Sequence, residues 1–145
     1  MAPSPAKFVE EALAISTQII KVSELALAHP ISADTRLVAS NLVSSQNQLT
    51  TSLGQVVANT DANLATAIAP ENEHMAAIKT LQDTAPDLFE ARYIDTIRES
   101  LENLQVLYAD YAKDGGSEPL RNFASSSQPD IEAAKNAADS LNLSN

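Results

Sequence analysis

Apolar side chains recur at steps of three and four residues in three long stretches of the chain, a spacing typical of one face of an α-helix. The first stretch begins near Pro5, which suits a first helical turn, directly after the natural N-cap residue Ser4. It ends at His29-Pro30, because the residue before a proline avoids the helical region. We therefore predict a first long helix between Pro5 and His29.

The second long helix is predicted over about residues 33–59, capped by Ser32, and the third over about 87–113, ended by Gly115-Gly116. Their apolar faces, like that of the first helix, are expected to point inward. The inward positions predicted in the three helices are Phe8, Ala12, Ile15, Ile19, Val22 and Ala26; Ala39, Leu42, Gln46, Leu49, Leu53 and Val56; and Glu90, Ile94, Ile97, Leu101, Leu104, Tyr108 and Tyr111.

Shorter helices are predicted to connect the long ones. One covers about residues 71–83 after a loop, and a second runs from Ser117 through Phe123. Pro129 is then expected to open a last helix, since proline is favoured in a first helical turn. The inward face of this last helix consists of Ile131, Ala134, Ala138 and Leu141.

These elements predict an all-α fold, a four-helix bundle with two short connecting helices, since no segment shows the alternation of a β-strand. The length of 145 residues fits one domain, and a hydrophobic content of 44% is enough for a core. We expect a single helical-bundle domain over residues 5–142, with a flexible N-terminus at 1–4 and a frayed C-terminus at 143–145.

The composition excludes several classes of function. Absence of cysteine rules out disulfides, a thiolate nucleophile and Cys-based metal sites. Only three glycines argue against phosphate-binding loops. A formal net charge of −10 repels nucleic acid and anionic lipid, and no apolar run approaches the length of a membrane span. We expect no nucleic-acid partner and no membrane insertion.

Candidate chemistry is sparse. Glu71 and His74 form one Glu-x-x-His, a spacing that places two metal ligands on one helical face. A di-iron bundle needs two such motifs, and acidic residues are also favoured at a helix N-terminus. Neither His29 nor His74 has an evident nucleophile partner, and no Gly-x-Ser-x-Gly occurs. The sequence predicts no enzyme, no catalytic residue and no cofactor, with Glu71 and His74 as the alternative metal site.

Half of the aromatic residues lie close together near the C-terminal part of the chain: Tyr108, Tyr111 and Phe123. The simpler interpretation is that these rings pack the terminal segment onto the bundle. The functional interpretation is an aromatic anchor for a partner protein, because Tyr and Phe are enriched in interface cores. Both interpretations are compatible with the sequence.

Several segments, taken in order, resemble a known family. They include Phe8-Val9-Glu10-Glu11-Ala12, Arg36-Leu37-Val38-Ala39, His74-Met75-Ala76-Ala77-Ile78, Phe89-Glu90-Ala91-Arg92-Tyr93, Leu107-Tyr108-Ala109-Asp110-Tyr111-Ala112 and Leu120-Arg121-Asn122-Phe123-Ala124. The pattern is similar to the ferritin-like bacterial envelope family labelled predicted outer-membrane protein of unknown function, over nearly the whole chain. The resemblance implies a periplasmic protein from which a signal peptide has been removed.

The chain departs from the pattern of that family at its inward polar positions. The family typically carries Glu in the first helix and His in the second, third and last long helices. These positions correspond here to Ile19, Gln46, Leu101 and Ala134. The resemblance therefore implies a bundle in which hydrocarbon has replaced most of any ferritin-like metal site.

The leading hypothesis is a non-catalytic periplasmic interaction protein, acting as accessory subunit, stabiliser or assembly factor of a larger envelope enzyme. Within this class, the chain resembles the small cofactor-free subunit of membrane-bound quinohaemoprotein alcohol dehydrogenases, which partners a PQQ-containing subunit and a cytochrome c subunit. The alternative is a metal-binding ferritin-like redox or stress protein that uses Glu71 and His74. A weaker alternative is a carrier of a small apolar ligand between the helices.

Overall fold

The computed structural model of the protein describes residues 4–141 except 61–70, and the side chains of these residues except 60 and 71–75. The predicted loop after the second helix, the flexible N-terminus and the frayed C-terminus fall largely outside these described residues.

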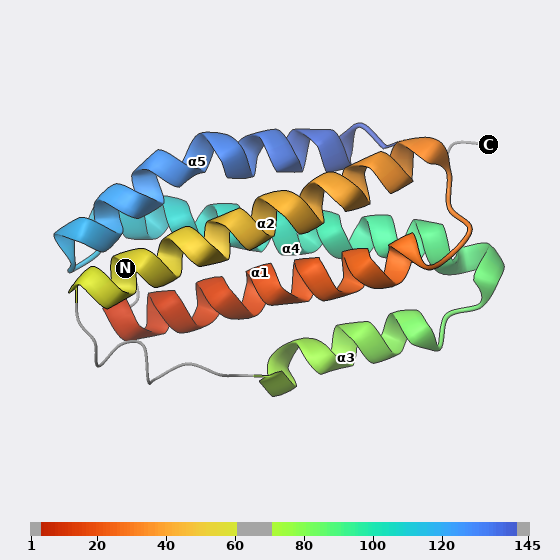
Figure 1. The fold of residues 1–145 in the computed structure, drawn as a ribbon, viewed down its shortest axis with the longest axis horizontal. Helices are drawn as coiled ribbons and strands as arrows, with labels where there is room; N and C mark the ends of the chain where they lie inside the picture. Colours follow the sequence, from red (N-terminus) through yellow and green to blue (C-terminus); the bar gives the residue numbers. More distant parts are fainter. Residues whose placement is uncertain (1–3, 61–70, 142–145) are drawn as a thin grey trace.

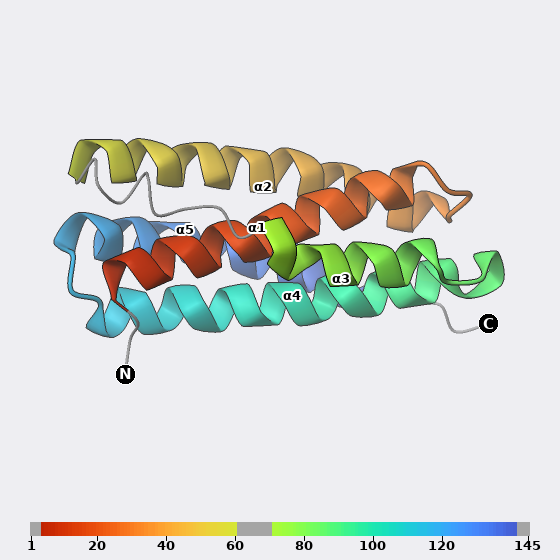
Figure 2. The same ribbon diagram turned by 90° about the horizontal axis from the view of Figure 1, so that it is seen from below.

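The part of the chain that the structure describes folds into five α-helices and contains no β-strand. The helices are α1 (Pro5–Leu27), α2 (Ala33–Thr60), α3 (Glu71–Gln82), α4 (Pro86–Asp114) and α5 (Glu118–Asp139). The four long helices lie side by side along the length of the molecule, and the short α3 lies outside them (Figures 1 and 2). The all-α prediction is confirmed.

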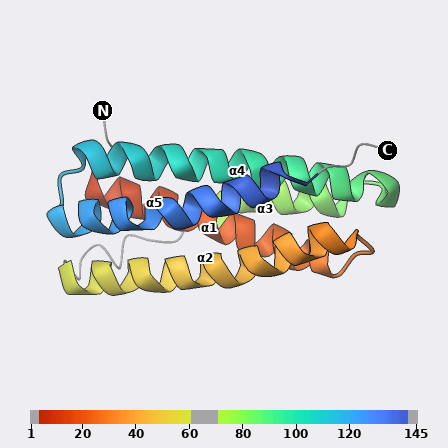
Figure 3. The ribbon, with the colours of Figure 1, turned by 90° about the horizontal axis from the view of Figure 1, so that it is seen from above.

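The long helices enclose one hydrophobic core. α1 packs on α2 and α4, and α5 packs extensively on α4 but only sparsely on α2, which closes a ring in the order α1, α2, α5, α4. α3 packs on α1 and α4. Figure 3, seen from above, shows α5 lying between α4 and α2. No helix within the described residues is long and apolar enough to cross a membrane.

The predicted starts of the first two helices agree with the caps that the structure shows. The Lys7 backbone N–H donates to Ser4 Oγ over 3.2 Å at the start of α1, and Pro5 occupies the first turn. The Thr35 N–H donates to Ser32 Oγ over 3.3 Å at the start of α2. These hydrogen bonds satisfy backbone donors that a helix N-terminus leaves unpaired.

Most of the predicted inward positions are buried. Ile15, Val56, Glu90 and Ala134 are only half-buried. Near the end of α2, Val57 rather than Val56 is buried in the core. The buried Tyr93 and Phe89 add aromatic packing that the apolar stripes did not include. The core is therefore aliphatic over much of its length, with rings gathered toward α4.

The predicted break before Pro129 is wrong, because α5 runs without interruption from Glu118 to Asp139 with Pro129 inside it. Proline removes one helical hydrogen bond, that to the carbonyl of Ser125, and Ser125 is exposed so that water can satisfy this carbonyl. Leu120 and Ile131, on either side of the proline, are buried in the same core and hold the two halves of α5 together. Figure 1 shows the accompanying bend in α5. The prediction of two short connecting helices is corrected accordingly, and α3 is the short helix among the five.

Candidate functional site

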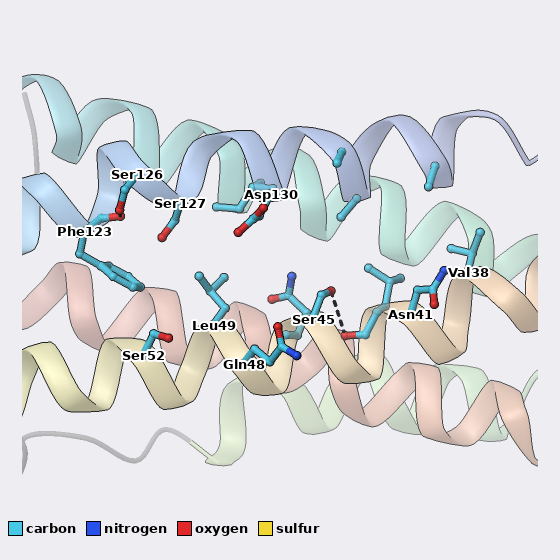
Figure 4. A pocket seen from close by; sticks show the side chains of 16 residues that line it. Val38, Asn41, Ser45, Gln48, Leu49, Ser52, Phe123, Ser126, Ser127 and Asp130 are labelled. Atoms are coloured by element: carbon cyan, nitrogen blue, oxygen red, sulfur yellow. Dashed lines mark hydrogen bonds between the residues drawn. The ribbon is translucent and has the colours of Figure 1, made fainter.

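A groove with a volume of about 580 Å³ lies between α2 and α5 (Figure 4). The two helices run in opposite directions along it, so that Ser52 of α2 lies below Phe123 of α5 and Leu49 lies below Ser127. The groove exists because the facing side of α5 carries small side chains, which leave the space between the helices unfilled. These small residues are Ser126, Ser127, Ala133, Ala134 and Ala137.

The lining of the groove is amphipathic. Its floor consists of buried residues of both helices, among them Leu42, Leu49 and Ile131. Its two edges are exposed and small or polar: Asn41, Gln48 and Ser52 on α2, and Ser126, Asp130, Ala133 and Ala137 on α5. An apolar floor with a few placed polar groups is typical of binding sites in proteins.

Gln46 is the unusual residue of the floor. Its side chain is 2% exposed, it lines the groove, and its Oε1 accepts no hydrogen bond within the described residues. A buried carbonyl oxygen without a donor costs roughly 1–3 kcal/mol, so such groups are rare in folded proteins. An N–H or O–H group placed in the groove would satisfy Gln46.

Asp130 carries the only charge in the groove lining. Its carboxylate is exposed at the α5 edge, and among the residues that the structure describes no lysine or arginine forms an ion pair with it. The groove thus offers the amide oxygen of Gln46 and the hydroxyl of Ser127 on its floor, and one negative charge on its edge.

The four positions where the resembled family carries polar ligands are not polar in this chain, apart from Gln46. Ile19 and Leu101 are fully buried in the core, and Ala134 is half-buried in the groove. Hydrocarbon side chains offer a metal no ligand atoms. Within the described part of the chain, no three His, Asp or Glu residues come together as a potential metal site. Glu71 and His74 begin α3, but their side chains lie outside the described residues.

The three aromatic candidates are packed against the bundle. Tyr108 and Tyr111 are completely buried, and Phe8 of α1 contacts both, stacked on Tyr111 at 4.3 Å between ring centroids and edge-on to Tyr108 at 5.2 Å. Burial of the Tyr108 hydroxyl raises its pKa. Phe123 lies 5.9 Å from the Tyr108 ring and also lines the groove. Of the three, only Phe123 thus borders a surface that a ligand could reach.

The groove itself was not predicted from the sequence. The sequence signal for it is a row of small residues in α5 at helical spacing and a row of short polar residues in α2, with Gln46 among the inward positions. Neither row shows which helices are neighbours, so the pair becomes a groove only in the folded structure.

Comparison with known proteins places the chain in a family. The family model described as "Domain of unknown function (DUF4142)" matches residues 1–141. No curated protein and no solved structure matches the chain. The match is consistent with the predicted resemblance to a bacterial family of unknown function, and because it spans nearly all of the sequence, the chain belongs to the DUF4142 family.

Proposed function

We propose that this protein is a non-catalytic binding subunit that holds a segment of a larger envelope enzyme in the groove between α2 and α5. The observation that carries the proposal is the buried Oε1 of Gln46 on the floor of the groove, which accepts no hydrogen bond within the described residues. A folded chain tolerates such a group when a partner supplies the missing donor.

The surroundings of the groove support a protein partner. Leu37 is 63% exposed and lies one helical turn before Asn41, so it extends the α2 edge with a large apolar side chain. Leu37 thus adds to the apolar area that a protein partner in the groove would cover. The long helices pack around a hydrophobic core cluster, and the groove lies at the edge of this cluster, where Leu42, Leu49 and Ile131 form its floor.

Charge indicates the character of the partner. The net charge of −10 favours encounter with a basic protein surface, and complementary charge mainly speeds and orients association. Asp130 provides a negative group at the groove itself.

Our proposal includes the periplasm as location and a ferritin-like arrangement of the four long helices. The chain direction supports the arrangement, because α2 and α4 run the same way and α3 lies on the connection between them (Figure 1). A single long crossover of this kind is typical of ferritin-like bundles. The resemblance to the cofactor-free subunit of quinohaemoprotein alcohol dehydrogenases makes such an enzyme the first partner to test.

The test is co-purification from the membrane fraction of the source organism with tagged wild-type protein and two leucine variants. Ala137→Leu adds bulk at the exposed α5 edge of the groove, and Ala91→Leu adds the same bulk at an exposed site on α4. Because both sites are exposed, both variants are expected to fold. We expect one envelope enzyme to co-purify with the wild type and with Ala91→Leu, in an amount nearly equimolar with the tagged protein. The same enzyme should be lost with Ala137→Leu.

Metals are quantified on the same samples. Near-equimolar metal with no partner would contradict the proposal and favour a metal site that includes Glu71 and His74. A partner retained equally by Ala137→Leu would show that binding does not use the groove.

A further inference from the structure

We propose that the occupant of the groove is an amphipathic α-helix of the partner, with an N–H or O–H donor in the middle of its apolar face and a basic residue on its flank. This inference rests on the proposed function and adds the chemistry of the occupant.

Both edges of the groove are rows of residues on one face of a helix. Asn41, Ser45, Gln48 and Ser52 follow one another on α2 at steps of four, three and four residues. Ser126, Asp130, Ala133 and Ala137 follow the same steps on α5. Because residues at steps of three and four lie on one face of a helix, each row forms a continuous edge along the groove. A third helix that packs between α2 and α5 sets its ridges of side chains along edges of this kind.

The size of the edge residues allows such a helix to approach closely. Ser45, Ser126, Ala133 and Ala137 have short side chains, and small residues permit close approach of helix backbones. From Asn41 to Ser52 the α2 edge extends about 17 Å, at about 1.5 Å per residue. This length corresponds to about three helical turns of the occupant. A groove open along such a length suits a helix better than a compact small molecule.

Gln46 determines where the occupant needs a hydrogen-bond donor, which is at the middle of the groove. It lies between the apolar floor residues Leu42 and Leu49, and its buried Oε1 has no donor in the described structure. A fully apolar helix would leave this oxygen unpaired, whereas a Ser, Thr, Asn, Gln or Lys side chain at the matching position would pair it. A single polar residue in an apolar helical seam fixes the register of packed helices, and Gln46 would do so here.

Asp130 determines the charge expected on the flank of the occupant. Its exposed side chain lies at the α5 edge, across the groove from Leu49 and Ser45 of α2 (Figure 4). A lysine or arginine one turn from the central donor of the occupant would face this carboxylate. An acidic residue at the same place would be repelled.

The experiment selects helices for the groove. A displayed library of amphipathic helices of about four turns, randomised on its apolar face and flanks, is enriched on the wild-type protein and then measured on variants. We expect the enriched sequences to share helix-period apolar residues, a central donor and a basic flank. Their dissociation constants should rise at least about tenfold for Ala137→Leu and stay unchanged for the control Ala91→Leu.

A second pair of variants tests the role of Gln46. Gln46→Leu should weaken helices that carry the central donor and strengthen otherwise identical helices with leucine there, whereas Gln55→Leu, exposed on α2 outside the groove, should change neither. Loss of stability would weaken both kinds of helix equally, so the reversal of preference identifies a direct contact.

Two results would overturn the inference. One is enriched helices that bind Ala137→Leu and Ala91→Leu equally well. The other is the absence of enriched helices while dodecanol, added as a neutral amphiphile, shifts the amide resonances of groove residues, which would make the groove a site for small ligands. If Ala137→Leu nevertheless loses the natural partner in co-purification, the proposed function holds and only the helical occupant is wrong.

Discussion

The Thr35 hydroxyl donates a hydrogen bond of 2.6 Å to Glu90 Oε2 and so joins the start of α2 to α4. Ser32, at the start of α2, donates to the same carboxylate through its hydroxyl at 2.7 Å and its backbone N–H at 3.0 Å. Burial alone would raise the pKa of Glu90, but these donors outweigh it and hold the pKa below its ordinary value of 4.5. A carboxylate therefore fixes the relative position of two helices.

This contact predicts a pH-dependent stability. A carboxyl whose folded-state pKa is lowered stabilises the fold above its unfolded-state pKa, and this stabilisation is lost as the pH falls through the folded-state value. Glu90→Gln should cost about 1–3 kcal/mol at about pH 7, as expected for hydrogen bonds to a charged group. Urea unfolding from about pH 7 down to about pH 3 should show that part of the acid destabilisation of the wild type is missing in the variant.

Thr35→Val tests the same contact from the side of the donor. It keeps the shape of the buried Thr35 side chain but removes the strongest side-chain donor to the carboxylate, so the pKa of Glu90 should move upward. NMR titration of the Glu90 carboxyl carbon measures this directly. An unchanged pKa in Thr35→Val would mean that Ser32 alone sets it.

Leu101 is a second point where stability can be tested. It is completely buried in α4, so Leu101→Ala should destabilise the fold by about 2–5 kcal/mol through lost burial and a residual cavity. Val106→Ala, on the same helix but 54% exposed, serves as control and should change stability by less than about 0.5 kcal/mol. Thermal or urea unfolding gives both values. A loss below about 1 kcal/mol for Leu101→Ala would contradict its place in the core.

Arg98 holds the C-terminal end of α5. Its guanidinium donates to the carbonyl oxygens of Ala138 at 3.2 Å, Asp139 at 3.3 Å and Leu141 at 2.5 Å. These bonds add donors at a helix end, where few backbone N–H groups remain for the last carbonyls. Arg98→Ala should lower the local opening free energy of the last turn of α5 by about 1–2 kcal/mol. Amide hydrogen exchange should show the loss there and not near Leu120.

Arg92→Ala is the control for Arg98. Arg92 is exposed on the same helix, so its removal should leave hydrogen exchange in α5 unchanged. Equal effects of the two variants would contradict a specific contact between Arg98 and the end of α5.

The sequence predicted the helices well because burial has the period of the helix itself. The prediction of buried positions and helix boundaries failed where tertiary packing, rather than local sequence, determines them. The step from Leu53 into the core is four residues, to Val57, rather than three, to Val56. Pro129 reads as a helix start by local preference, yet shared burial of the flanking apolar residues keeps α5 continuous. The groove depends on α2 and α5 being neighbours, which no local pattern states.

Gln46 links the stability of the fold to the proposed site. Because its buried Oε1 accepts no hydrogen bond from the part of the chain that the structure describes, replacing Gln46 with leucine removes an unpaired polar group and adds apolar burial. We expect Gln46→Leu to leave the free energy of unfolding unchanged or raise it by about 1 kcal/mol, measured by urea unfolding of the isolated protein. The exposed Gln55→Leu should have little effect.

A loss of more than about 1 kcal/mol in Gln46→Leu would mean that the amide is paired within the fold, and the groove would then lose its requirement for a donor from the partner. A gain in stability together with weaker partner binding is the combination expected of a residue kept for recognition, since binding sites retain polar groups at a cost to the free fold.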